Sequence, residues 1–158
     1  MKRILVMSDT HGRRAAIAAA LARCKDADCI IHLGDYAQDV AYVRELTDKP
    51  VYGVRGNCDL SAGAPAELEL ILDGVRIAAV HGHQQGVKTS LLRLGLYALE
   101  KQAALVLFGH THVPTEQFYE GVTLYNPGSL GEPRGRKATF GVITTDAGGF
   151  RIKTNTIE

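Results

Sequence analysis

The sequence predicts one α/β domain whose sheets contain both parallel and antiparallel strands. Its 158 residues are close to the usual size of a single domain, and 46% hydrophobic with 22% charged residues is ordinary for a globular chain. In the first half, short apolar runs alternate with segments of helical periodicity, as in parallel β-α-β units. In the second half, apolar runs follow one another across glycine-rich turns, as in hairpins. No linker or repeat interrupts the chain, so we expect a single domain over residues 1–158.

The first half is predicted to fold as strand, helix, strand, helix, strand. Residues 3–7 are a continuous apolar run, which is typical of a strand buried on both faces. Residues 13–25 have helical spacing, because Ile17, Leu21 and Cys24 recur on one side. A strand, a helix and a strand are then expected over residues 29–33, 37–47 and 51–54.

The second half is predicted to be rich in strands. Residues 68–72 and 75–80 flank an Asp73-Gly74 turn, which is the pattern of a β-hairpin. Further strands are expected over residues 104–108, 115–119, 122–125, 139–144 and 149–154.

A helix expected over residues 87–101 has two apolar stripes on roughly opposite sides. One stripe consists of Val87, Leu91, Leu94 and Ala98, and the other of Leu92, Leu96 and Leu99. One helix face can meet only one sheet, so the second stripe is covered either by another part of the chain or by a second subunit. We favour the subunit contact and expect a homodimer or higher homo-oligomer. A monomer in light scattering would contradict this expectation.

Composition excludes several classes of protein. The formal net charge of +1 does not provide the strongly positive surface that binds nucleic acid or an anionic membrane. No apolar run approaches the roughly 20 residues of a transmembrane helix. Three cysteines without a CxxC pair argue against a disulfide framework and against a thiolate zinc site. The apolar run Ile4–Met7 after Lys2 and Arg3 is too short for a signal peptide. We therefore expect a cytoplasmic protein without a membrane or specific nucleic-acid partner.

Side chains that can bind ligands follow directly after five of the predicted strands, each time in a turn that contains glycine. These turns are Ser8–Gly12, Gly34–Asp35, Gly56–Asp59, His81–His83 and Gly109–His112. Five of the six histidines fall in them, whereas histidines with only structural roles would be scattered. Open α/β sheets assemble their sites at strand ends, and glycine lets neighbouring loops approach closely. We therefore expect the five turns to converge on one site.

The convergent side chains predict a binuclear metal centre. Asp-x-His and His-x-His units direct alternate side chains to a common point, and their ligand atoms suit mid-series divalent ions. The candidate ligands are Asp9, His11, Asp35, Asn57, His81, His110 and His112. They are too many for one tetrahedral ion but enough for two that share a carboxylate. We expect Mn²⁺ first, with Ni²⁺, Fe²⁺, Co²⁺ or Zn²⁺ as alternatives, and the residual positive charge would attract a phosphoryl group.

Together, these turns resemble the five signature motifs of the calcineurin-like metallophosphoesterases. The chain length and the Asn126–Ser129 segment resemble the small single-domain phosphodiesterase branch of that family. The resemblance implies two stacked mixed β-sheets flanked by helices, a four-layer α/β sandwich. It also implies one metal held by Asp9, His11, Asp35 and His112, and a second held by Asp35, Asn57, His81 and His110, with Asp35 as the bridge.

The resemblance implies hydrolysis of phosphate esters by a metal-bound hydroxide, with both ions and Asn57 stabilising the equatorial oxygens. Asn57, His81 and Asp35 are therefore the expected catalytic residues. The expected substrate is a small phosphodiester. A phosphomonoester or nucleotide is the alternative, because the motifs do not show how many ester bonds the phosphorus of the substrate carries. A non-catalytic scaffold is a further alternative, but this chain keeps every metal-binding histidine. A nuclease would need a basic track or an added domain to hold a polynucleotide, and neither is visible.

Cys58 stands where the commonest family pattern has a histidine that acts on the leaving oxygen. A thiol is a weak acid and a weak hydrogen-bond donor. We therefore expect either a preference for good leaving groups or proton donation by another group, such as His83. Asn57, Cys58, His83 and Arg134 are the expected substrate contacts. The spacing leaves open whether His81 or His83 binds metal, and we favour His81 because it stands at the strand end.

Four other residues have structural interpretations. His32 lies within a predicted strand and is expected to be a packed or hydrogen-bonded core histidine. Asp59 is expected to brace its turn, and Cys24 and Cys29 are expected to fill the core as small apolar groups.

Overall fold

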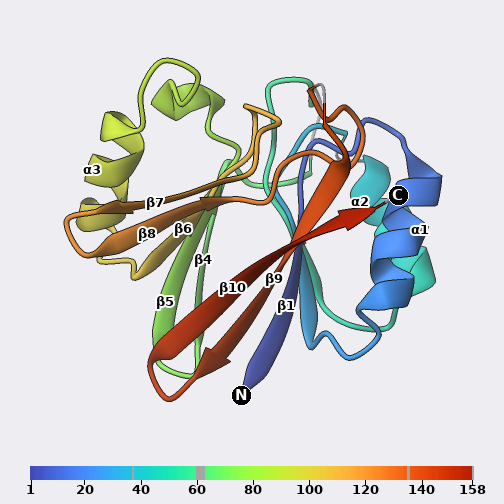
Figure 1. Ribbon diagram of the computed structural model, residues 1–158, viewed down its shortest axis with the longest axis horizontal. Coiled ribbons are helices and arrows are strands. Elements are labelled where there is room, and N and C mark those ends of the chain that lie inside the picture. The colour runs from blue at the N-terminus through green and yellow to red at the C-terminus, as the bar shows by residue number, and fades with distance from the viewer. Residues whose placement is uncertain (37, 60–62, 135, 158) are drawn as a thin grey trace.

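Two five-stranded sheets lie face to face between helices in the computed structural model, which describes residues 1–36, 38–59, 63–134 and 136–157 (Figure 1). The first sheet has the strand order β10-β9-β1-β2-β3. Its strands are β1 (Lys2–Met7), β2 (Cys29–His32), β3 (Val51–Gly53), β9 (Ala138–Asp146) and β10 (Gly149–Ile157). β1, β2 and β3 are parallel, whereas β9 and β10 are antiparallel additions.

Helices α1 (Arg14–Arg23) and α2 (Gln38–Leu46) connect the parallel strands of the first sheet and cover its outer face. They confirm the predicted helices with slightly shorter bounds, and position 37 of the second prediction lies outside the described residues. Such crossovers leave the carboxyl ends of β1, β2 and β3 at the same edge.

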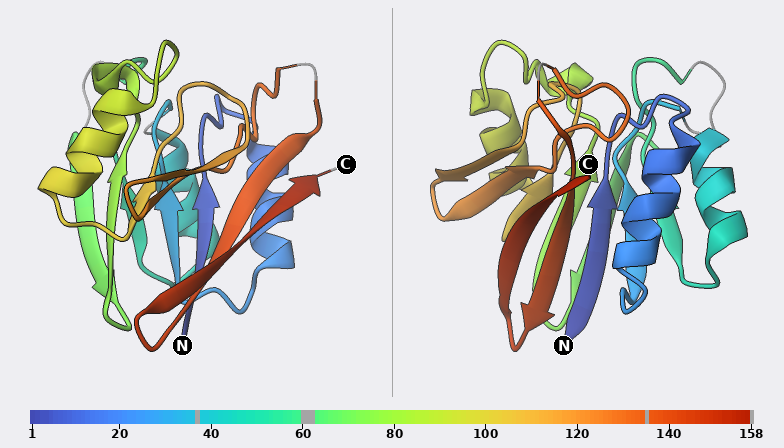
Figure 2. Two further views of the ribbon diagram at one scale, coloured as in Figure 1. Left: turned by 60° about the vertical axis from the view of Figure 1, so that its left-hand side comes forward. Right: turned by 45° about the vertical axis from the view of Figure 1, so that its right-hand side comes forward.

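The second sheet has the order β4-β5-β6-β8-β7. Its strands are β4 (Glu67–Leu72), β5 (Val75–Val80), β6 (Leu105–Leu107), β7 (Thr115–Tyr119) and β8 (Val122–Asn126). The central strands β5, β6 and β8 are parallel, and the edge strands β4 and β7 are antiparallel to their neighbours. Helix α3 (Leu92–Glu100) covers the outer face, so the two sheets lie between α3 and the pair α1 and α2 (Figure 2).

Strand β1 shows why its sequence reads as a continuous apolar run. Ile4 and Val6 pack in the core between the two sheets, while Leu5 and Met7 pack in the core under α1 and α2. Successive side chains of a strand point to opposite faces, so both faces of β1 require apolar residues. With a third core between the second sheet and α3, the expected four-layer arrangement is confirmed.

The helix expected over residues 87–101 begins later than predicted. α3 starts at Leu92, and a short 3-10 helix at His83–Gln85 precedes it. Gly86 ends that turn in the left-handed conformation, and the Ser90 hydroxyl accepts a hydrogen bond from Leu92 N at 3.1 Å. Val87 packs in the same core as α3 but lies in the preceding turn. Its apolar side chain therefore continued the helical spacing beyond the true start of the helix.

The two apolar stripes of α3 have different environments. Leu94 and Ala98 are fully buried against the second sheet. By contrast, Leu92, Leu96 and Leu99 are 55%, 52% and 42% exposed. The second stripe is therefore exposed, and its cover by a second subunit stays a prediction. Among the described residues, none of the helices is both long and apolar enough to cross a membrane.

Candidate metal centre and active site

The turns after β1, β2, β3, β5 and β6 meet at one rim of the molecule. His112 Nε2 lies 3.3 Å from Asp9 Oδ1, although the two residues come from different sheets. His81 Nε2, also from the second sheet, lies 3.5 Å from Asp35 Oδ1 of the first. The structure therefore brings together the turns that the sequence analysis expected to converge.

Four predicted ligands form a compact cluster. Asp9, His11, Asp35 and His112 offer ligand atoms that all lie within 4.8 Å of one another. Two of these residues carry buried polar atoms without a hydrogen-bond partner, Asp9 Oδ1 and His11 Nε2. An unpartnered buried polar atom is costly, and a cation between these atoms would satisfy both. Carboxylate and imidazole are suitable ligands for mid-series divalent ions, so the four residues fit a metal ion.

A second group of predicted ligands lies on the other side of Asp35. His81 Nε2 is 3.1 Å from Asn57 Oδ1, and the ring centroid of His110 is 5.0 Å from that of His81. Asp35 directs Oδ1 toward His81 and Oδ2 toward His11, where the distance to Nε2 is 3.7 Å. One carboxylate thus faces both groups.

Backbone carbonyls orient two of the histidines. His81 Nδ1 donates to Leu33 O at 2.7 Å, and His112 Nδ1 donates to Glu132 O at 2.8 Å. A carbonyl oxygen only accepts, so Nδ1 carries a proton in each ring, and Nε2 is a ligand atom whenever the ring is neutral. The structure places His81, rather than His83, against the carboxylate. The His83 ring lies 5.4 Å from the His81 ring.

The predicted ligand residues have unusual backbone conformations. Asp9, His11, Asp35, His110 and His112 have φ values between 45° and 72°. They are half of the ten non-glycine residues with positive φ among the described residues. The left-handed region is unfavourable for side chains with a Cβ, and such strain concentrates at functional sites. The surrounding structure must therefore hold these loops in place.

Two glycines allow the loops to approach one another. A Cβ on Gly56 would lie 2.1 Å from Asp35 Oδ1, and a Cβ on Gly109 would lie 2.0 Å from Ser8 Oγ. Such distances exclude any side chain, so the glycines predicted to permit close approach are required at these two positions.

A buried chain of hydrogen bonds, which the sequence analysis missed, connects the first two ligand loops. Gly34 N donates to His32 Nδ1 at 3.1 Å, so the ring carries its proton on Nε2 and donates to Thr10 Oγ1 at 2.8 Å. The Thr10 hydroxyl donates to Asp39 Oδ2 at 2.5 Å, which also accepts from Gly12 N at 2.8 Å. Burial lowers the pKa of His32, which keeps it neutral. The prediction of a hydrogen-bonded core histidine is confirmed.

The Asn126–Ser129 segment clamps two other ligand loops. The Ser129 hydroxyl donates to Asp9 O at 2.8 Å, and Asn126 Nδ2 donates to Gly109 O at 3.0 Å. The sequence analysis noted this segment only as a family resemblance. Its role depends on contacts more than 15 positions apart along the chain, which no local pattern reveals.

The structural interpretations of Asp59 and two cysteines are confirmed. Asp59 Oδ2 accepts hydrogen bonds from Gly56 N at 2.8 Å and from Asp35 N at 3.2 Å, so it braces the turn. Cys24 and Cys29 are buried, and burial raises the pKa of Cys29 to about 11.

The predicted substrate contacts lie at the rim. Cys58 is exposed, its Sγ is 3.8 Å from Asn57 Nδ2, and its backbone N donates to Asp35 Oδ1 at 3.0 Å. Arg134 is exposed, and its charge partly opposes the rise in the pKa of His112. Burial, followed by the charge of His81, lowers the pKa of His83.

Tyr36 is a rim residue that the sequence analysis missed. Its ring centroid lies 5.4 Å from that of His11, at 55° between the planes, and its side chain is 37% exposed. Its position directly after Asp35 is the only signal in the sequence that could have indicated it.

The charges of the site favour a cation. Burial alone would raise the pKa of Asp9 and of Asp35, but the neighbouring His112 and His81 outweigh it and lower both values. Conversely, the carboxylates raise the pKa of His81 against the effect of burial, and the neighbouring Asp9 carboxylate raises that of His112. Burial and the charge of His81 lower the pKa of His110 to about 4. Two carboxylates thus share protons with two histidines, and a metal ion would replace those protons.

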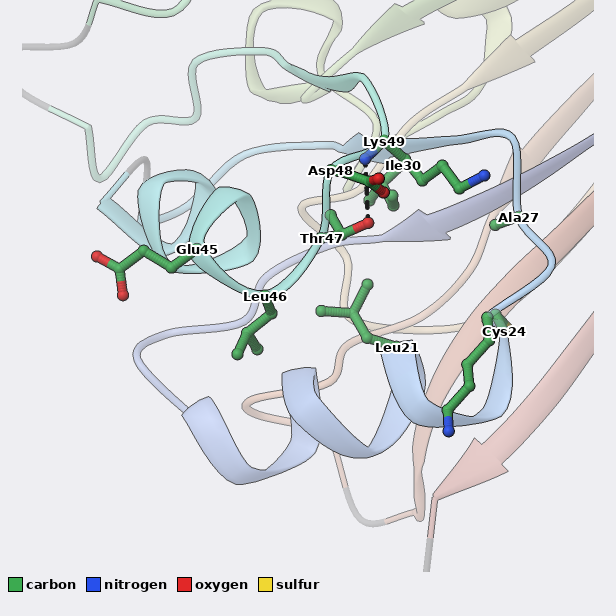
Figure 3. A pocket seen from close by; sticks show the side chains of 10 residues that line it. Leu21, Cys24, Ala27, Ile30, Glu45, Leu46, Thr47, Asp48 and Lys49 are labelled. Atoms are coloured by element: carbon green, nitrogen blue, oxygen red, sulfur yellow. Dashed lines mark hydrogen bonds between the residues drawn. The ribbon is translucent and has the colours of Figure 1, made fainter.

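A separate hollow of about 550 Å³ lies between the carboxyl-terminal ends of α1 and α2. It is lined by Leu21, Cys24, Lys25, Ala27, Ile30, Glu45, Leu46, Thr47, Asp48 and Lys49 (Figure 3). Figure 3 shows Glu45 pointing away from the other labelled side chains, and none of the predicted site residues lines this hollow. It offers no convergent set of ligand groups.

A histidine and carboxylate cluster at the rim of two stacked mixed sheets is the arrangement expected of a metallophosphoesterase. The sequence profile of the calcineurin-like phosphoesterase superfamily domain matches residues 1–148, and the chain belongs to that superfamily. Members of this family use divalent metals.

The chain is similar to the probable metallophosphoesterase YsnB of Bacillus subtilis (strain 168), with 31% identity over 145 residues, 90% of this chain and 84% of that protein. It is 28% identical over 173 residues to the phosphodiesterase YfcE of Escherichia coli (strain K12), across 92% of this chain and 89% of that protein. A solved structure of a predicted phosphoesterase from Streptococcus pneumoniae TIGR4 superposes with a TM-score of 0.80 at 31% identity, covering 98% of this chain and 89% of that one.

We expect Thr10→Val to weaken metal binding by about tenfold or more, the usual effect of removing a group that orients ligands. The substitution removes the acceptor for His32 and the donor to Asp39, so the loop that carries Asp9 and His11 loses its support. Isothermal titration calorimetry with Mn²⁺ measures the affinity. Thr10→Ser keeps the hydroxyl and should restore binding.

Thr145→Val is the matched control for Thr10→Val. Thr145 is fully buried, and its hydroxyl donates to Asp73 Oδ2 at 2.8 Å. In the sheet, Thr145 lies opposite Lys2, at the end of β1 that is far from the turn carrying Asp9 and His11. We expect lower thermal stability with unchanged metal affinity. Equal losses of metal affinity in both valine variants would show that Thr10 has no specific role in metal binding.

Metal should stabilise the protein more at about pH 8.5 than at about pH 6. Without metal, the raised pKa values of His81 and His112 contribute stability below the ordinary histidine pKa of 6.5, and this contribution is lost as pH rises through the folded-state values. At the higher pH, a metal ion no longer has to displace protons from these two imidazoles. The melting temperature in chelator and in excess Mn²⁺ should differ more at the higher pH, and a constant difference would contradict the proton sharing.

Proposed function

We propose that this chain is a divalent-metal-dependent phosphoesterase that hydrolyses a small phosphodiester at a binuclear centre. The main support is the position of Asp35, whose two oxygens face separate groups of ligand residues. Membership of the superfamily supports phosphate-ester hydrolysis, and the relative named a phosphodiesterase supports a diester substrate.

In this proposal, Asp35 belongs to both metal sites. One ion would be held by Asp9, His11, Asp35 and His112, and the other by Asp35, Asn57, His81 and His110. Two divalent ions, when bound, supply a water that is activated near neutral pH and positive charge opposite the phosphoryl oxygens. Mn²⁺ is the ion that we propose first.

The chain's own groups would position the ester. Asn57 is exposed, and its Nδ2 is available to donate to a phosphoryl oxygen while Oδ1 faces His81. Arg134 at the rim would attract the anionic substrate. His83, kept neutral by its lowered pKa, would donate a hydrogen bond without supplying charge. No strong acid then stands at the position of Cys58, so esters with good leaving groups are preferred.

Hydrolysis of bis(4-nitrophenyl) phosphate tests the proposal. Protein purified in chelator should be inactive, added Mn²⁺ should restore activity, and the diester should react faster than 4-nitrophenyl phosphate. Asp35→Asn should lower kcat at least about a hundredfold, because it removes the shared charge. Asp73→Asn replaces a distant aspartate and should keep normal kcat. Activity that persists in strong chelator would contradict the metal assignment, and faster turnover of the monoester would favour a phosphomonoesterase.

Cys58→His should make the rate less dependent on the pKa of the leaving group, because an imidazole can protonate the departing oxygen. The measurement is the slope of log kcat/KM against leaving-group pKa for a series of aryl diesters. Cys58→Ala should keep the wild-type slope, since the thiol donates little. An identical slope in the histidine variant would show that this position does not reach the leaving group.

A further inference from the structure

Tyr36 has a strained backbone that its packing does not offset. Its φ is 70°, in the left-handed region, which is a genuine outlier for a bulky aromatic residue. Yet its side chain is 37% exposed. By contrast, the structural Tyr125 is 1% exposed and its hydroxyl lies 2.7 Å from Thr154 Oγ1. An outlier of this kind points to a function rather than to the core.

The exposed ring lies directly beside the metal ligands. The His11 ring is 5.4 Å away, and His11 Nε2 in turn faces Asp35 Oδ2 at 3.7 Å. The ring also lies beside Gly12, where a Cβ would be 3.5 Å from Tyr36 Cε2, an ordinary van der Waals contact. One imidazole therefore separates the tyrosine ring from the carboxylate that faces both ligand groups.

The side chain of Tyr36 has no evident role in starting α2. The contact with that helix is made by the backbone, because Tyr36 O accepts from Asp39 N at 2.9 Å. Any residue would provide this carbonyl. The exposed part of the aromatic ring can therefore contact another molecule at the rim.

We propose that Tyr36 determines substrate specificity by forming a wall on which an aromatic or heteroaromatic group of the phosphate ester packs. The proposal rests on the proposed function, since it needs the phosphate to occupy the metal centre. A flat ring next to an exposed tyrosine gains an offset-stacked or edge-to-face contact, which an alkyl ester of similar charge lacks. The preferred substrate class is therefore an ester with an aromatic organic group.

Binding of two phosphonates that cannot be hydrolysed tests the proposal without turnover. Titration calorimetry on the Mn²⁺-loaded protein should show phenylphosphonate binding about threefold to tenfold more tightly than methylphosphonate. Tyr36→Gly should abolish this difference, and Tyr36→Phe should keep it because the ring remains. Equal affinities in the wild type, or an unchanged difference in Tyr36→Gly, would overturn the role of Tyr36. Failure to bind either phosphonate would overturn the proposed function as well.

Thermal stability separates this role from a structural one. Tyr36→Gly relieves the positive φ, so its melting temperature should equal or exceed that of the wild type. Glu120→Gly is the matched control, because Glu120 is exposed with φ 50° in the turn between β7 and β8. It should relieve comparable strain and leave the phosphonate selectivity unchanged. A clear fall in the melting temperature of Tyr36→Gly would show that the ring supports the fold and would overturn the proposal.

Discussion

The arrangement of the site depends on the carboxylate of Asp35, which lies between two groups of histidines. Its oxygens face His11 and His81 from opposite sides, and its backbone is in the left-handed region. Asp59 holds its backbone N, and Gly56 leaves room for its side chain. A small displacement of this one group would therefore disturb both groups of ligand residues.

Holding such a group requires a rigid surrounding, and the structure supplies it through buried hydrogen bonds rather than through apolar packing alone. The chain through His32, Thr10 and Asp39 connects two loops whose conformations are each unfavourable. A strained conformation persists only where its neighbours determine it. The unfavourable backbone conformations destabilise the loops of the predicted ligands but fix their geometry. Such a trade-off between stability and activity is common at functional sites.

The sequence predicted the individual strands and the converging turns because both leave local signals, whereas the stacking of two sheets was implied by the family resemblance. A strand buried on two faces has a continuous apolar run, as in β1, and parallel strands end at one edge with glycine in the turns. The start of α3 was wrong because Val87 packs like a helical residue while lying in a turn. Spacing alone does not separate these cases.

Contacts between distant residues could not be predicted in the same way. Thr10 and Asp39 are 29 positions apart, and their pairing depends on how α2 lies on the first sheet. The exposed ring of Tyr36 depends on a backbone angle that no periodicity encodes. The sequence therefore indicated which residues gather at the rim, but not which oxygen faces which histidine or what supports them.

The two sheets contribute different halves of the ligand set. Asp9 and Asp35 follow strands of the first sheet, whereas His81 and His112 follow strands of the second. Elsewhere the sheets meet chiefly through buried apolar side chains. An ion bound to ligands from both sheets would cross-link the two layers. In the proposed function, loss of that ion would therefore loosen the contact between the layers and make the protein more susceptible to proteolysis.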